Sequence, residues 1–314
     1  MTDTDNPRLG IALRIVSGVL FTGMVICIKA VSDTVPLGQT VFFRSFFALV
    51  PLIVFLWLRK EFPAGLKTKR PLGHLVRSTF GAAAMFTSFA CVALLPLSEA
   101  VLLAQLTPII TALAAVLLLA ERLTRWRVMG LGLGLTGVVA LVGPELGGGL
   151  LDGARVLGIA LGLLTAVLTA IALIMVRSLN RTESPGAIAL YFVVAAMIGG
   201  LITIPWGWEF PNVQALVLLV LAGLLGGFAH IAMTLSFRYA EASQLAPFEY
   251  VALIWPVLAD LLVFGLIPTT AFLIATPLVL AGAAVAATER TSSNATKKQS
   301  HHSALTCSPE CSHS

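Results

Sequence analysis

The stretch ASQLAPFEYVALIWPVLADLLVFG, residues 242–265, decides the class of fold. It is long and apolar enough to cross a bilayer, because a spanning helix needs about 20 mostly apolar residues. It nevertheless contains Glu249 and Asp260, and an acid in hydrocarbon is costly unless it faces protein, water or a partner. Pro247 and Pro256 each remove a backbone donor, which predicts a kinked or locally open helix. Acids beside freed carbonyls indicate a polar pathway inside a membrane.

The composition of the whole chain agrees with this interpretation. Of 314 residues, 58% are hydrophobic and 11% are charged, whereas soluble domains have about 25% charged residues. This excess of apolar residues predicts a polytopic membrane protein. The net charge of +5 comes from basic residues in short loops, so we expect no nucleic-acid partner. The four cysteines are divided between apolar segments and the C-terminal tail, which predicts no disulfide framework.

Apolar segments of near-spanning length predict an all-α protein with ten transmembrane helices. They cover residues 9–29, 38–58, 73–95, 97–119, 126–143, 156–177, 185–205, 213–236, 242–265 and 268–288. Residues 1–8 form a polar N-terminus, 144–155 a glycine-rich linker, and 289–314 a polar tail that we expect to be disordered.

The basic residues set the expected orientation. With the N-terminus inside, the inner loops hold nearly all of them: Arg59, Lys60, Lys67, Lys69, Arg70, Arg122, Arg125, Arg127, Arg181, Arg238, Arg290, Lys297 and Lys298. The outer side holds Arg155, with Lys29 at a helix end. Since positive loops stay in the cytoplasm, we expect an inner-membrane protein with both termini cytoplasmic.

An internal repeat divides the chain into two halves, residues 9–143 and 156–288. The tetrapeptide GIAL occurs at Gly10–Leu13 and again at Gly158–Leu161. An alignment with an offset three residues shorter pairs Gly81 with Gly226 and Gly137 with Gly282. Each repeat has five helices, so the second repeat enters the membrane from the opposite side. This is an inverted-topology repeat, an architecture of many secondary transporters, with a site near the midplane between the halves.

The stretch LPLSEAVLLAQLTPIITALAAVLLLAERLT, Leu95 to Thr124, resembles the hallmark of the drug/metabolite transporter superfamily, in its ten-helix EamA-type branch. The matching features are Ser98, Ala100, Pro108, Glu121 and Gly137, followed in the second half by Ala242, Ser243, Gly265, Pro268 and Gly282. The resemblance covers residues 9–288. It implies solute transport without ATP hydrolysis, often export and often proton-linked.

Two positions depart from this pattern. Leu253 and Leu266 stand where the second half would repeat Pro108 and Glu121, so no role is carried over for that second acid. The run APFEYVALIW also resembles a subset that transports S-adenosylmethionine-like and vitamin-like solutes.

Arg44 and Asp260 each lie about six residues from the outer end of a predicted helix, a similar depth that makes them a candidate ion pair. Three interpretations remain. The pair is a static link between two helices, a zwitterionic substrate or a proton breaks it during transport, or the two residues never meet.

Glu249, followed by Tyr250, and His230 fall in the inner half of the membrane and are candidates for sharing a proton. Their interaction is either a structural hydrogen bond between helices or a site for proton coupling or a substrate amine. Trp255, beside Pro256, is the aromatic residue that we expect to stack on a substrate.

Other membrane residues receive simpler interpretations. Tyr191 and Phe43 are further candidates for an aromatic cavity wall. Arg14 and Arg77 are expected to snorkel to the inner surface, and Lys29 to snorkel or to bind the negative end of a helix.

No ATP-binding loop, catalytic triad or closed metal site occurs, so we expect neither an enzyme nor a cofactor. The tail carries His301, His302, Cys307, Cys311 and His313, but their spacing matches no closed site. We predict a secondary transporter that moves a small polar or zwitterionic organic solute (amino-acid-like, S-adenosylmethionine-like or vitamin-like) by alternating access, with protons as a candidate coupling ion and membrane lipid as its surroundings. The alternatives are a non-transporting structural or regulatory membrane protein and a membrane-embedded enzyme.

Overall fold

The computed structural model describes residues 6–60, 62–63, 68–111, 125–147, 153–179, 182–240, 245, 248 and 252–285, and these contain helices and no strand. The principal helices are α1 (Pro7–Val31), α2 (Leu37–Leu58), α3 (Pro71–Leu94), α4 (Leu97–Ala104), α6 (Arg125–Gly147), α7 (Gly153–Leu179), α8 (Pro185–Ile202), α9 (Val213–Tyr239), α11 (Ile254–Leu262) and the helix Thr270–Val285. A short 3-10 helix, η2 (Ile204–Trp206), follows α8. Each of the ten predicted apolar segments therefore contains a helix.

Several helices begin where the sequence provides both a cap and a proline. The side chain of Asn6 accepts a hydrogen bond from the N–H of Leu9 at the start of α1, with Pro7 as the first helical residue. Ser184 accepts from the N–H of Ala187 at the start of α8, again before a proline. These side chains satisfy N–H groups that lack a partner in the first turn, and proline loses nothing there.

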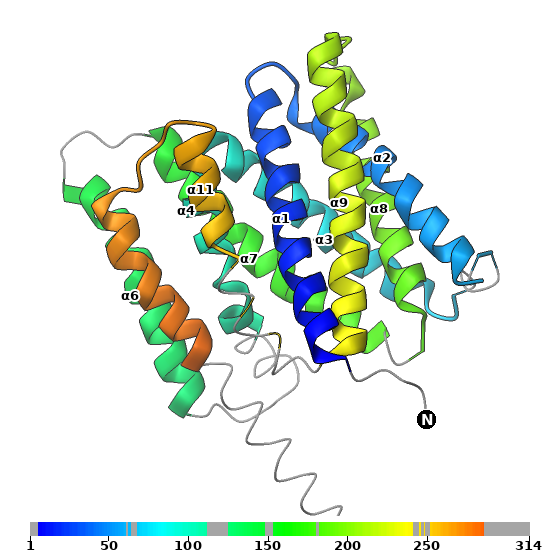
Figure 1. Cartoon of the computed structure of the whole chain (residues 1–314). Helices are drawn as coiled ribbons and strands as arrows, with labels where there is room; N and C mark the ends of the chain where they lie inside the picture. Colours follow the sequence, from blue (N-terminus) through cyan, green and yellow to red (C-terminus); the bar gives the residue numbers. More distant parts are fainter. Residues whose placement is uncertain are drawn as a thin grey trace, which may run out of the picture.

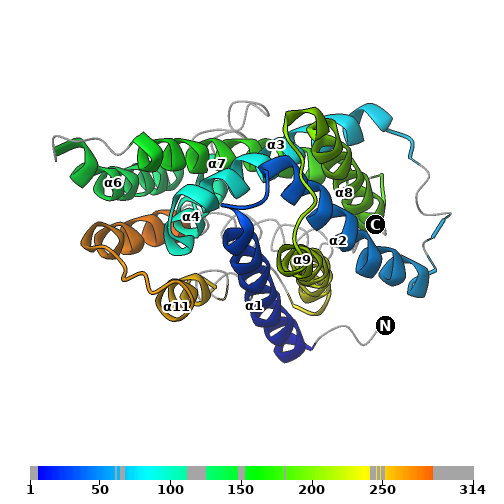
Figure 2. The same cartoon turned by 90° about the horizontal axis from the view of Figure 1, so that it is seen from above.

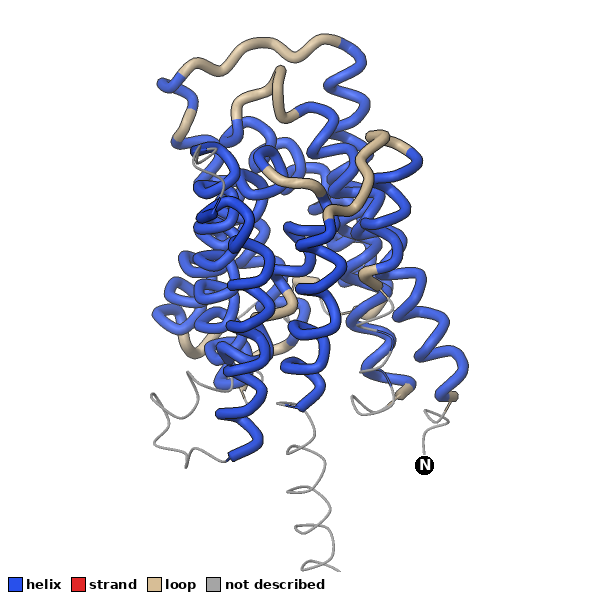
Figure 3. Tube along the Cα trace, turned by 90° about the vertical axis from the view of Figure 1, so that its left-hand side faces the viewer, coloured by secondary structure: helices blue, strands red, loops and turns tan. Residues whose placement is uncertain are grey.

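The helices run side by side along one direction, and the described loops gather at the two ends (Figure 3). Six of them, α1, α2, α3, α7, α8 and α9, are long and apolar enough to cross a membrane. Large apolar side chains cover the outer surface: on α2, Val50 is 52% exposed, Val54 is 50% exposed and Leu58 is 68% exposed. A surface of this kind faces lipid, and the chain is an integral membrane protein.

Two helices are interrupted near prolines. The α-helix that begins at Leu97 turns at Gln105 and Leu106 before it resumes, and Pro108 lacks the N–H that would bind the carbonyl of Ala104. In the ninth segment Leu245 and Phe248 are helical, Ala252 and Leu253 form a turn, and α11 begins at Ile254, so Pro256 lies in the first turn of α11. The predicted break at Pro256 is confirmed, and Pro247 lies outside the described residues.

Helix contacts follow a pseudo-two-fold symmetry between the halves. The helix α1 packs on α9, and its counterpart α7 packs on α3; α2 packs on α9, and α8 packs on α3. The start of α1 and the end of the helix Thr270–Val285 lie at the same end of the molecule (Figure 1). The fold is thus all-helical and built from two inverted repeats, as predicted.

The symmetry extends to single residues where α6 crosses the helix Thr270–Val285, at one edge of the molecule (Figure 2). A methyl group on Gly137 would lie 3.1 Å from the carbonyl oxygen of Ala275 and 3.1 Å from the nitrogen of Val279. A methyl group on Gly282 would lie 2.7 Å from the carbonyl oxygen of Gly130 and 2.7 Å from the nitrogen of Gly134. In the repeat alignment, Gly130 corresponds to Ala275 and Gly134 corresponds to Val279. The close contacts of Gly137 and Gly282 are therefore related by the symmetry of the two halves.

Candidate functional site

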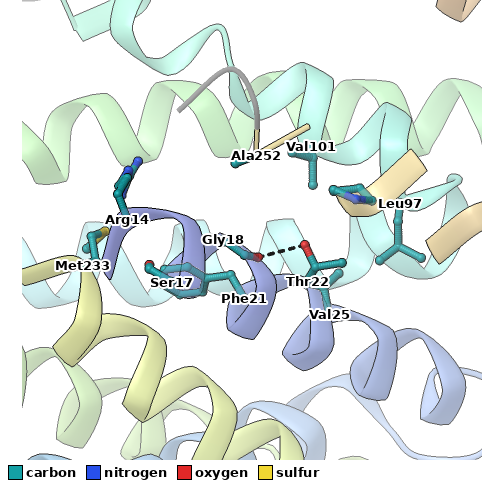
Figure 4. Close-up of a pocket in the computed structure, with 11 residues that line it drawn as sticks. Arg14, Ser17, Gly18, Phe21, Thr22, Val25, Leu97, Val101, Met233 and Ala252 are labelled. Carbon is teal, nitrogen blue, oxygen red and sulfur yellow. Dashed lines mark hydrogen bonds between the residues drawn. The ribbon is translucent and has the colours of Figure 1, made fainter. Parts of the chain in front are cut away.

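A cavity of about 170 Å³ lies between the two halves (Figure 4). Its walls come from α1 and α4 of the first repeat and from α9 and the ninth segment of the second. The lining residues are Arg14, Ser17, Gly18, Phe21, Thr22, Val25, Leu97, Val101, Met233, Ala252 and Pro256. The wall is mostly apolar and carries a few polar groups, as small-molecule sites do.

One face of α1 supplies about half of this wall. The lining residues from Arg14 to Val25 recur at intervals of three or four, which places them along one side of the helix. The hydroxyl of Ser17 donates to the carbonyl of Ala229 at 3.1 Å, which fixes α1 against α9. The hydroxyl of Thr22 donates to the carbonyl of Gly18 at 3.0 Å, so its oxygen stays available as an acceptor.

The ninth segment borders the cavity through Ala252 and Pro256. Trp255 lies against α1, because a methyl group on Gly18 would be 3.5 Å from indole atoms Cδ1 and Nε1. Trp255 is therefore near the cavity without being one of its lining residues. Glu249 and Tyr250 lie outside the described residues, and their predicted roles stay predictions.

Asp260 caps another helix. Its side chain is buried in α11, where one carboxylate oxygen accepts from the N–H of Leu97 at 2.9 Å and the other from the N–H of Ser98 at 2.8 Å. These are unpaired donors at the positive end of α4. Of the three interpretations of Arg44 and Asp260, the structure supports the last, that the two residues do not meet, because Nη2 of Arg44 lies 3.6 Å from the sulfur of Met24. Equal depth along two helices does not bring them together laterally.

Lys29 lies near Asp260 and binds the end of the neighbouring helix α3. Its ammonium donates to the carbonyls of Val92 at 3.0 Å and Leu95 at 2.6 Å, at the negative end of α3. It also interacts electrostatically with Asp260 and lies 5.7 Å from the centroid of the Phe264 ring. The first of the predicted roles for Lys29, snorkelling, is therefore replaced by the second, binding to a helix end.

His230 lies on α9, where its ring meets the Phe21 ring edge-on at 5.0 Å between centroids. Phe21 also lines the cavity, so one side chain contacts both the cavity and His230. The guanidinium groups of Arg44 and Arg77 both interact electrostatically with His230. The predicted sharing of a proton with Glu249 stays a prediction.

Comparisons with known proteins assign the family. Residues 8–143 match the EamA-like transporter family. The pseudopaline exporter CntI of Pseudomonas aeruginosa is 27% identical over 252 residues, 79% of this chain and 85% of that protein. A riboflavin transporter of Rhizobium johnstonii is 29% identical over 234 residues, 74% of this chain and 75% of that protein. A solved crystal structure with a TM-score of 0.62 and 23% identity covers 88% of this chain and 95% of its own, and it has the same fold.

These matches support the drug/metabolite transporter superfamily, with residues 8–143 as an EamA-like transporter domain. The relatives are named as transporters of small molecules and not as enzymes. A small-molecule solute is therefore its partner.

Two arginines have contacts that the sequence did not predict. Arg14 lines the cavity, and its expected snorkelling stays a prediction. Arg77 was also expected to snorkel, but its Nε and Nη1 atoms are buried and its guanidinium lies 4.2 Å from the centroid of the Phe192 ring. The position of Arg77, well inside a spanning helix, was the signal available in the sequence.

Two of the aromatic residues that the sequence singled out pack against other rings. Tyr191 packs on His74, with ring centroids 4.5 Å apart. Phe43 packs on Phe42 and Phe47. Neither Tyr191 nor Phe43 lines the described cavity, and their predicted place in an aromatic wall stays a prediction.

Proposed function

We propose that this protein is a secondary transporter that moves a small polar or zwitterionic organic metabolite across the bacterial inner membrane by alternating access. The observation that carries the proposal is the cavity enclosed by α1 and α4 of one repeat and by α9 and the ninth segment of the other. In carriers built from inverted repeats, the solute site lies between the repeats, and rocking of one repeat against the other exposes it to each side in turn.

Three features support an organic solute of metabolite size. The cavity wall combines apolar side chains with Arg14, Ser17 and Thr22, which suits a molecule with both polar and apolar parts. Trp255, beside this wall, is positioned to meet an aromatic ring of a solute. Two relatives are named for pseudopaline and for riboflavin, which are organic solutes.

The basic loops support the proposed orientation. Arg59, Lys69 and Arg70 flank the connection between α2 and α3, at the end of the molecule where α1 begins. Because short positive loops remain in the cytoplasm, this end faces the cell interior and both termini are cytoplasmic.

Protons are the proposed coupling ion, with Glu249 as the carrier of the proton. An acid in a membrane segment binds a cation or releases a proton as its surroundings change. In the topology predicted from the sequence, His230 lies in the same inner half of the membrane as Glu249. Tyr250 follows Glu249 directly in the chain.

The test measures flux through the purified protein in liposomes. The labelled probes are riboflavin, S-adenosylmethionine and an aromatic amino acid. Metabolite profiling of cells with and without the protein guides the choice among them. We expect flux of at least one probe above that of protein-free liposomes, with a rate that responds to a pH gradient. Binding without flux would contradict the carrier and favour the structural or regulatory alternative.

Glu249→Gln isolates the proposed coupling step. Because glutamine does not exchange a proton, we expect the pH-gradient-driven part of the flux to fall to background while the protein stays in the membrane. Glu209→Gln, an exposed acid between α8 and α9, is the matched control and should transport normally. Normal pH-dependent flux in Glu249→Gln would remove Glu249 from the mechanism.

A further inference from the structure

The first turn of α4 lies between two elements of the second repeat, α7 and α11 (Figure 2). On the side of α7, Nη2 of Arg155 donates to Oε1 of Glu99 at 3.0 Å. On the side of α11, the carboxylate of Asp260 accepts from the N–H groups of Leu97 at 2.9 Å and Ser98 at 2.8 Å. Polar contacts thus join the two repeats at the end of the molecule opposite to the start of α1, which the proposed topology places outside.

The side of α4 toward α11 borders the cavity. Leu97 and Val101 line the cavity from α4, and Ala252 and Pro256 line it from the ninth segment. Asp260 follows Pro256 by four residues, which places it on the same side of α11 and about 6 Å further along the helix axis. The cavity therefore separates α4 from the ninth segment, and the carboxylate of Asp260 joins them one turn beyond Pro256.

This contact between α11 and α4 is closed to water. Asp260 is 1% exposed, Leu97 is 0% exposed and Ser98 is 2% exposed. Leu97 belongs to both the contact and the cavity, because its N–H binds Asp260 and its side chain lines the wall. A movement of α11 that withdraws the carboxylate from α4 therefore opens the wall of the cavity at its outer end.

The chemistry of the contact allows it to open and to close again. In the closed contact, the carboxylate of Asp260 and the first N–H groups of α4 satisfy one another. When they separate at the outer end of the molecule, water from outside binds both. Exchanging hydrogen bonds within the protein for hydrogen bonds to water changes the free energy little, whereas opening an apolar contact exposes apolar surface to water.

The inverted repeat does not require an acid at this position. The alignment that pairs Gly137 with Gly282 also pairs Asp260 with Ala115. The two glycines recur because the helix crossing that they form is common to both halves. An acid in one half alone therefore points to a role at one face of the membrane rather than to packing that both halves share.

We propose that Asp260 is the outer gate residue of the carrier, a positioning residue for alternating access, and this assignment rests on the proposed function. The structure is the conformation that is closed to the outside. Outward opening breaks both hydrogen bonds of the carboxylate, moves α11 away from the first turn of α4, and exposes Leu97 and Val101 to the outer solution.

The experiment measures access to the cavity from each face of the membrane. Val101→Cys is placed in a full-length chain whose four natural cysteines are replaced by serine. A membrane-impermeant sulfonated maleimide labels it from outside in spheroplasts and from inside in inverted vesicles. We expect Asp260→Asn to raise the outside rate about tenfold, as loss of one charged hydrogen bond shifts the population, and to lower the inside rate.

Two controls accompany this measurement. Asp33→Asn changes an exposed acid near the same end of α1 and should leave both rates unchanged. Phe210→Cys, at a fully exposed position between α8 and α9, reports the access of the reagent from outside. Its outside rate should be the same with aspartate and with asparagine at position 260.

A second variant keeps Asp260 and removes one of its donors. Leu97 is the first residue of α4, where proline fits a helix, so Leu97→Pro deletes one N–H and leaves the helix in place. It should also raise the outside rate of Val101→Cys and lower the inside rate. Unchanged rates in both variants would overturn the gate. Faster labelling from both faces would mean that the contact only stabilises the fold, and this too would overturn the gate.

The labelling needs no solute, so it separates the gate from the carrier function. Unchanged labelling together with solute flux in liposomes would overturn the gate and leave the carrier intact. Opposite shifts of the two rates without flux of any probe would leave the outer closure standing and overturn the carrier.

Discussion

The carboxylate of Asp260 binds the first N–H groups of α4 and lies near the ammonium of Lys29, which binds the last carbonyls of α3. From the sequence it follows that a buried acid needs a partner, and this expectation was correct. The identity of the partner was not predictable, because it depends on which helix end packs against α11. The contact of Arg77 with Phe192 was not predicted for a related reason. The position of a residue in the sequence gives its depth in the membrane but not the direction of its side chain.

Asp260→Asn should destabilise the protein. An amide leaves one oxygen to accept from two N–H groups and removes the negative charge from the positive end of α4. Loss of a charged hydrogen bond in a buried site costs about 1–3 kcal/mol. Thermal or denaturant unfolding in detergent measures the change. Asp33→Asn, at an exposed position near the same end of α1, should change stability by less than about 0.5 kcal/mol. Equal effects of the two substitutions would argue against the cap.

At the scale of helices, apolar length and turn residues predicted the elements well, since each spanning segment must satisfy its backbone internally. The side-chain contacts that join one loop to another were not predicted. Glu183, between α7 and α8, accepts from the N–H of Lys69 at 2.9 Å and from the hydroxyl of Thr68 at 3.1 Å, and it lies 3.6 Å from Nε2 of His74. It thereby joins the segment before α3 to the connection after α7. A single acid in a polar loop carries no pattern that reveals such a contact.

The contacts of Glu183 predict that the stability of the protein depends on pH. The hydrogen bond from the Lys69 N–H, followed by those from Thr68 and His74, lowers the pKa of Glu183 from its ordinary value of 4.5. A lowered pKa stabilises the fold fully above pH 4.5, and this contribution disappears as the pH falls through the lowered value. Glu183→Gln should therefore melt lower than wild type at neutral pH, and the difference should shrink as the solution is acidified below 4.5.

The control for this prediction is Glu209→Gln, which removes an exposed acid from another loop. Its melting temperature should follow that of wild type throughout the pH series. A difference between Glu183→Gln and wild type that stayed constant on acidification would mean that the glutamate stabilises the loop by packing rather than by its charge.

Across the whole molecule, two alignments of the first half of the sequence with the second were enough to predict the inverted repeat. Equivalent glycines recur in the two halves because helices approach closely there. The charges that make the halves unequal could also be located in the sequence, but their contacts could not. Arg44 lies against Met24 and Gly226, and Arg77 lies over the ring of Phe192. An alignment of the two halves does not show which helices pack side by side.

The crossing of α6 with the helix Thr270–Val285 tests the symmetry directly. Alanine is favoured over glycine in a helix by about 1 kcal/mol, whereas forcing an atom into a filled contact costs about 1–3 kcal/mol. Gly282→Ala would press a methyl group to 2.7 Å from the backbone of Gly130 and Gly134, and Gly137→Ala would meet Val279 at 2.7 Å. We expect both variants to melt below wild type, with Gly282→Ala lower because backbone yields less than a side chain. Gly132→Ala, also on α6 but with open space around the added methyl, should melt at or above wild type. A drop in all three variants would point to helix flexibility rather than to close approach at a symmetric crossing.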